Sequence, residues 1–120
     1  MATEYIINRQ YYLGAWVHAF EAIFGWDIAR VQEFCQRWEN HLNTGDGMFY
    51  HENPMYYVAA EIVDHVEPPI IGARRNRLTR EIQFAIENGD INLERNANFD
   101  WDSAAKRVEL VLKRHNIPMR

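Results

Sequence analysis

The stretch DIARVQEFCQRWENHLNTGDG, residues 27–47, is the clearest structural signal in the chain. Its apolar residues are spaced three, four, three and four apart, which places them on one stripe of an α-helix: Ile28, Val31, Cys35, Trp38 and Leu42. Asp27 precedes the stripe as an N-cap, because its carboxylate can accept a backbone N–H that has no partner within the helix. Residues 43–47 tolerate positive φ and end the helix. The stretch predicts one amphipathic helix, with Trp38 and Ile28 in the central core.

Similar spacing predicts four more helices, at about residues 8–24, 54–66 and 73–88, and one that is capped by Asp100 or Asp102 and ends at about residue 115. Turn signals separate them, notably Gly25, Asn53-Pro54 as a helix start, Pro68-Pro69 and Gly89. Because so few residues join the first helix to the second, we expect these two helices to form an antiparallel hairpin. The predicted fold is all-α: a single-domain bundle of about five helices over residues 1–120.

Composition narrows the class of protein. A chain of 120 residues that is 48% hydrophobic is long and apolar enough to bury one core, which argues against disorder. Cys35 is the single cysteine, so we expect a buried thiol and a reducing compartment. No apolar run reaches the length of roughly 18 residues that a membrane span requires. The start Met-Ala-Thr-Glu lacks the basic and apolar pattern of a signal peptide, so we expect a cytoplasmic protein.

Four arginines open the predicted helix at residues 73–88: Arg74, Arg75, Arg77 and Arg80. Helical geometry places Arg77, Arg80 and Phe84 on one side. Arginines beside an aromatic ring can bind phosphate and stack on a base, or they can dock onto a carboxylate-rich protein surface. A third interpretation is a solvated face, neutralised by glutamates farther along the same helix. The net charge of −4 favours a protein partner over nucleic acid.

Aromatic residues supply the second candidate surface. Tyr50, His51, Tyr56 and Tyr57 surround the predicted helix start at Asn53, a composition typical of interfaces because tyrosine buries area and keeps a polar group. The alternative is that they cover the core. Trp26, between the first two helices, is either a lid on the core or an exposed anchor for a partner.

Residues that could support catalysis lack the necessary pattern. Ser103 lies in a predicted helix cap without a glycine elbow, and Gly45-Asp46-Gly47 lacks the Lys-Ser/Thr of a phosphate loop. The acidic and histidine residues at positions 51, 52, 64 and 65 do not show zinc-ligand spacing. We therefore predict no enzyme activity, no metal and no cofactor.

The expected function is a non-enzymatic protein–protein interaction module, an adaptor or inhibitor of the kind found among phage or bacterial accessory proteins. The residues assigned to its partner surface are Arg74, Arg75, Arg77, Arg80, Phe84, Tyr50, His51, Tyr56 and Trp26. The alternative is a nucleic-acid-associated helical protein that uses the arginine-rich helix. Helix-turn-helix geometry is disfavoured because Pro68-Pro69 precedes that helix.

Overall fold

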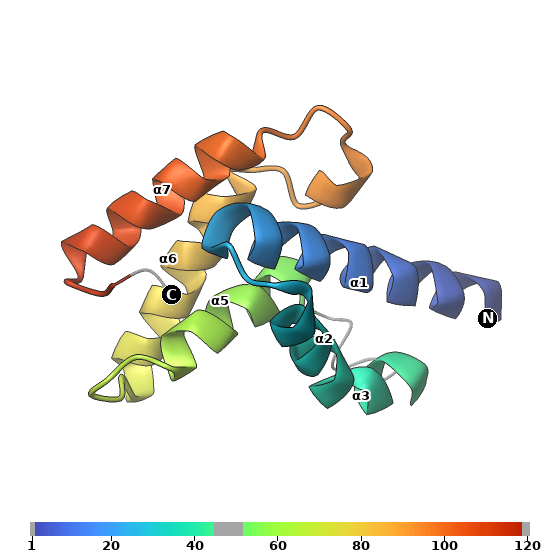
Figure 1. The fold of residues 1–120 in the computed structure, drawn as a ribbon, viewed down its shortest axis with the longest axis horizontal. Helices are drawn as coiled ribbons and strands as arrows, with labels where there is room; N and C mark the ends of the chain where they lie inside the picture. Colours follow the sequence, from blue (N-terminus) through green and yellow to red (C-terminus); the bar gives the residue numbers. More distant parts are fainter. Residues whose placement is uncertain (1, 45–51, 119–120) are drawn as a thin grey trace.

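A computed structural model describes residues 2–44 and 52–118, which form helices and their connections, with a long loop between the last two α-helices (Figure 1). The helices are α1 (Ala2–Phe24), α2 (Ile28–Arg37), α3 (Glu39–Thr44), α5 (Pro54–Asp64), α6 (Gly72–Glu87) and α7 (Trp101–Arg114), with a 3-10 turn, η1 (Leu93–Arg95). No strand occurs in the described ranges. The prediction of an all-α, single-domain bundle is confirmed.

Four helices form a closed ring of packing partners. α1 packs against α5 and α7, α5 packs against α6, and α6 packs against α7, while α2 packs on α1. At the centre, Trp16 is fully buried and its indole N–H donates to the carbonyl oxygen of Pro54 at 3.0 Å. Other large side chains of the core are Phe20, Phe34, Met55, Leu78, Ile82, Ile86 and Leu112. Each ring helix therefore contributes an apolar stripe to one core.

The turn between α1 and α2 follows the sequence signals closely. Gly25 adopts a φ of +66°, which lets the N–H of Trp26 donate to the carbonyl oxygen of Phe20 at 3.1 Å. Asp27 caps α2 as predicted, because its carboxylate accepts the backbone N–H of Arg30 at 2.9 Å. α2 then packs on α1, and the Phe34 ring lies 4.7 Å from the Phe20 ring, centroid to centroid.

The helix predicted over residues 28–42 is divided in two. The N–H of Trp38 donates to Cys35, three residues back, at 3.2 Å, and this tighter turn separates α2 from α3. The prediction that Ile28 belongs to the core is wrong, because its side chain is 54% exposed. Phe34, off the predicted stripe, is buried and turns the packed side of α2 away from Ile28. Trp38 and Cys35 are consequently only partly buried, at the edge of the core.

Helix ends show where local signals succeed and fail. Asp100 caps α7 by accepting the N–H of Ser103 at 3.0 Å, but Asn53 precedes α5 without a side-chain cap. α7 ends in a Schellman motif, in which Asn116 has a φ of +58° and the N–H of Ile117 donates to Leu112 at 2.9 Å. The sequence analysis missed this motif, although asparagine followed by an apolar residue and proline is its usual signature.

η1 contacts α1 at Gly14, where the missing side chain leaves room for Glu94. A Cβ added at Gly14 would lie 3.1 Å from a carboxylate oxygen of Glu94. The same carboxylate lies 2.9 Å from Nδ1 of His18, so the Glu94 side chain lies across α1 between these two residues. Across the described parts of the chain, no helix has the combined length and apolar character that crossing a bilayer requires.

Candidate functional site

Two of the four arginines of α6 bind carboxylates of this same chain. Arg75 forms a two-pronged pair with Asp64, with N–O distances of 2.9 and 3.0 Å. Arg80 binds both carboxylate oxygens of Glu52 at 2.8 and 2.9 Å. These hydrogen bonds raise the pKa of both guanidinium groups above the ordinary arginine value. Arg75 and Arg80 therefore stabilise the junction of α5 and α6, so their charges are already matched within the chain, and their assignment to a partner surface stays a prediction.

The pairing of Arg77 with Glu81, which the solvated-face interpretation implies, does not form. Glu81 accepts a hydrogen bond from Arg114 at 2.7 Å and lies 3.2 Å from Nε2 of His115, so it bridges α6 to the end of α7. Arg74 and Arg77 are exposed, and neither forms an ion pair with another residue in the described ranges. Two positive charges on the outer side of α6 are thus available to a partner.

A shallow groove of about 400 Å³ lies between α6 and α7. Its lining residues are Phe84, Ala85, Asn88, Arg107, Leu110, Val111 and Arg114. Phe84 and Leu110 are 64% and 62% exposed, respectively, and both line this one groove. The sequence analysis selected Phe84 but missed Leu110. The missed signal was a leucine off the apolar stripe of α7.

Arg107 holds the two walls of this groove together. Its guanidinium donates to the carbonyl oxygens of Ala85 and Ile86 at 2.6 and 3.1 Å. These carbonyls belong to the last turn of α6, where the helix dipole favours a cation. The contact fixes α7 against the end of α6 and keeps the groove preformed.

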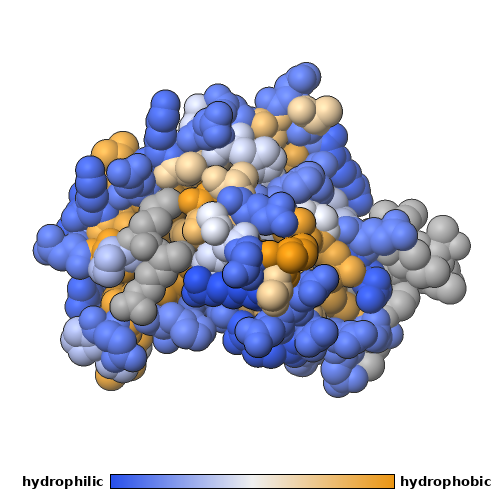
Figure 2. Space-filling view, viewed as in Figure 1, coloured by the Kyte–Doolittle hydropathy of each residue, from blue (hydrophilic) through white to orange (hydrophobic). Residues whose placement is uncertain are grey.

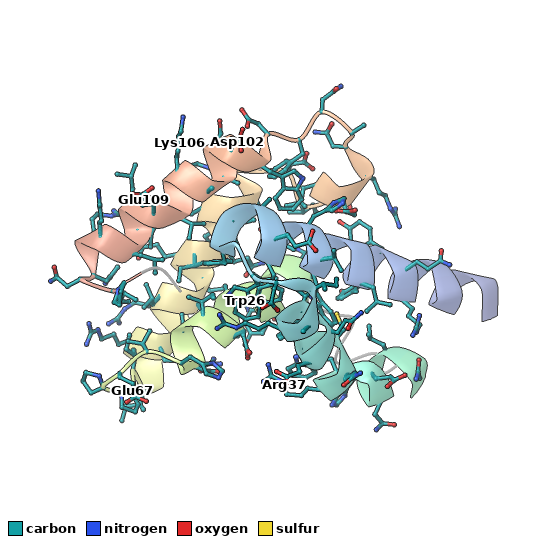
Figure 3. All side chains as sticks on the ribbon, viewed as in Figure 1. Trp26, Arg37, Glu67, Asp102, Lys106 and Glu109 are labelled. Carbon is teal, nitrogen blue, oxygen red and sulfur yellow. The ribbon has the colours of Figure 1, made fainter. Side chains whose placement is uncertain are left out.

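Trp26 lies beneath a second groove, of about 600 Å³, between α2 and α5 (Figure 3). The indole is 6% exposed, stacks on Phe20 at 4.1 Å and is covered by the Arg30 guanidinium at 3.7 Å. Trp26 is therefore a lid on the core, and the interpretation as an exposed anchor is wrong. Arg37 pairs with Glu61 across this groove, so much of the charge on its walls is already neutralised.

The tyrosine-rich segment does not form an exposed aromatic patch where the structure describes it. Tyr57 is 8% exposed and belongs to the core. Tyr56 lies under the guanidinium of Arg80, which is 4.6 Å from the ring centroid. Tyr50 and His51 lie outside the described residues. These contacts favour the core-covering interpretation for Tyr57 and an intramolecular role for Tyr56.

A chain of polar side chains runs along α6 from the partly exposed Arg80 to the buried Glu87. Nη1 of Arg80 donates to Gln83 at 2.9 Å, and the Gln83 amide lies 3.4 Å from the carboxylate of Glu87. Glu87 is 3% exposed, and burial raises the pKa of its carboxyl group above the usual value. Gln83 and Arg80 partly compensate the buried charge of Glu87. The hydrogen bonds therefore continue from the Glu52–Arg80 pair, through Gln83, to Glu87 in the interior.

The remaining candidates for chemistry have structural contacts. The hydroxyl of Ser103 donates to Asp100 at 2.7 Å as part of the α7 cap. Partial burial raises the pKa of the Cys35 thiol, which disfavours the nucleophilic thiolate. Within residues 2–44 and 52–118, no three His, Cys, Asp or Glu side chains come together as a metal site.

Comparison with protein families, curated proteins and solved structures finds no match to this chain.

Proposed function

We propose that this chain is a non-enzymatic protein–protein interaction module whose contact region is the α6–α7 surface. We define this surface by Arg74, Arg77, Phe84, Leu110 and Arg114. The observation that carries the proposal is the exposure of Phe84 and Leu110, at 64% and 62%, on one groove. Covering large apolar side chains is favourable, and clustered exposure of this kind is typical of binding surfaces.

The surroundings of the groove fit the anatomy of an interface. Apolar side chains at its centre supply binding energy, while Arg74 and Arg77 lie on the same side of α6 and supply orientation. The groove walls are already joined by Arg107, so a partner would bind a preformed shape and lose little ordering entropy. On the face drawn in Figure 2, most of the surface is hydrophilic and the hydrophobic residues form small separate patches.

A second candidate function is nucleic-acid binding, and one observation favours it. Arg74 and Arg77 are exposed without a carboxylate partner among the described residues. Phosphate binding commonly uses such arginines. We rank it second because Leu110 has no counterpart in base stacking or phosphate contact, and because the whole chain carries a charge of −4.

Site-specific cross-linking in the native host would test the proposed function. A photoreactive amino acid placed at position 84 or 110 should give the same protein adduct, whereas position 28, with Ile28 54% exposed on α2, should not. The purified partner should then lose affinity for the double variant Phe84→Ser, Leu110→Ser. Unchanged affinity, with both variants folded, would show that the α6–α7 surface is not the interface.

A further inference from the structure

The α6–α7 surface has a charge opposite to that of the rest of the chain. α6 and α7 together contain eight Arg or Lys and four Asp or Glu residues, a net charge of +4. Asp64 and Glu52, which pair with Arg75 and Arg80, reduce this charge to +2. Since the whole chain carries −4, the remaining residues then carry −6. An acidic partner is therefore attracted to the α6–α7 surface. The acidic remainder of the molecule repels the same partner when it approaches from another side.

The positive charge near the groove is carried by particular residues. Arg74 and Arg77 continue the line of Phe84 toward the start of α6, over about 15 Å of helix. Arg114 lines the groove from α7 and shares Glu81 with His115, so one carboxylate is divided between two partners. Lys106 lies elsewhere, on the outer edge of α7 beside Asp102 and Glu109 (Figure 3).

The shape of the groove selects among acidic partners. α7 runs back along α6, since Arg107 reaches the carbonyls of Ala85 and Ile86 while Arg114 reaches Glu81, nearer the start of α6. A groove between two neighbouring helices accepts a ridge of side chains spaced three or four residues apart on a third helix. About 15 Å corresponds to roughly three helical turns.

We infer that the partner inserts an acidic amphipathic helix into the α6–α7 groove, an inference that rests on the proposed function. Its apolar side chains pack between Phe84 and Leu110, and its carboxylates pair with Arg74, Arg77 and Arg114. An acidic amphipathic helix would contact both the exposed apolar side chains and the arginines of the α6–α7 surface. A nucleic acid would leave Leu110 without an apolar contact.

Two synthetic peptides of about 18 residues would test this partner chemistry. Both carry leucine at i, i+3, i+4 and i+7 on one face, with glutamate on the flanks in one peptide and lysine in the other. Calorimetric titration at low salt should show the glutamate peptide binding at least about tenfold more tightly. The double variant Phe84→Ser, Leu110→Ser should lose binding, while Ile28→Ser, a matched exposed apolar substitution, should retain it.

Charge reversal gives the sharpest readout. Arg74→Glu with Arg77→Glu should reverse the preference, so that the lysine peptide binds more tightly than the glutamate peptide. Thermal melting establishes that each variant is folded. Equal binding of both peptides to the wild type, or tighter binding of duplex DNA that survives Phe84→Ser, Leu110→Ser, would overturn the inference.

The outcomes also separate the two proposals. If the cross-linked native partner needs Phe84 and Leu110 but the peptides show no charge preference, the acidic-helix inference fails and the proposed function stands. If substitution of Phe84 and Leu110 affects neither the native partner nor the peptides, both fail.

Discussion

The guanidinium of Arg80 binds both carboxylate oxygens of Glu52, at 2.8 and 2.9 Å. The pair joins α6 to the residue that precedes the start of α5. It also continues inward through Gln83 to the buried carboxylate of Glu87. An arginine that sequence analysis placed on a partner surface is therefore part of the internal structure.

Replacing Arg80 should lower stability, whereas replacing Arg74 should not. Arg80→Ala leaves Glu52 and Gln83 without their shared donor, and we expect a loss of about 1 kcal/mol in the free energy of unfolding. Arg74→Ala, at an exposed site on the same helix, should change it by less than about 0.5 kcal/mol. Denaturant titration of both variants measures the difference, and equal losses would contradict the assigned role of Arg80.

Nucleic-acid binding should be weak at physiological salt. Because Arg75 and Arg80 are paired within the chain, only part of the α6 arginine cluster is available to phosphates. At about 150 mM salt we expect only non-specific affinity for duplex or single strands, with Kd on the order of 10⁻⁴–10⁻⁶ M. A gel-shift titration measures this. Sub-micromolar binding that is lost in Arg74→Glu, Arg77→Glu would promote the second candidate function.

Replacing Trp16 should destabilise the core much more than replacing Ile28. Trp16 is fully buried and donates to Pro54, so Trp16→Ala should cost about 3–5 kcal/mol. Ile28 is 54% exposed, and Ile28→Ala should cost less than about 1 kcal/mol. Chemical unfolding with matched protein concentrations compares them. A large loss for Ile28→Ala would mean that α2 packs differently from the structure described.

The buried carboxyl group of Glu87 makes stability depend on pH. Burial raises its folded-state pKa above the ordinary value of 4.5, so the folded state holds this proton more tightly than the unfolded state does. The contribution of Glu87 to stability is therefore greatest below pH 4.5 and declines as pH rises through the folded-state pKa.

Glu87→Gln should remove that decline while keeping an oxygen to accept from Gln83. The variant should be more stable than the wild type at pH 7, and the difference should shrink as pH falls below 4.5. Thermal melts across this pH range, with the surface substitution Glu109→Gln as control, provide the measurement. A Glu87→Gln variant that is less stable at pH 7 would show that the ionised carboxylate stabilises the fold.

Much of the fold could be predicted because its signals are local. Asp27 accepts the backbone N–H predicted of a cap, and of the two candidates for the last helix, Asp100 and Asp102, it is Asp100 that does so, since capping depends on neighbours three residues away. The break at Trp38 was not predictable in this way. It follows from packing Phe34 against α1, which selects a different side of α2 from the one that periodicity indicated.

The sequence by itself determined the helices, the caps and most of the buried stripes, because these depend on residues within one or two turns. The tertiary structure decided which charges are available. Arg75 and Arg80 find Asp64 and Glu52, 11 and 28 residues away, and local spacing carries no information on such pairs. The tertiary structure also brought Phe84 and Leu110 to one groove. The exposure of a side chain depends on which side of its helix the neighbouring helices leave uncovered.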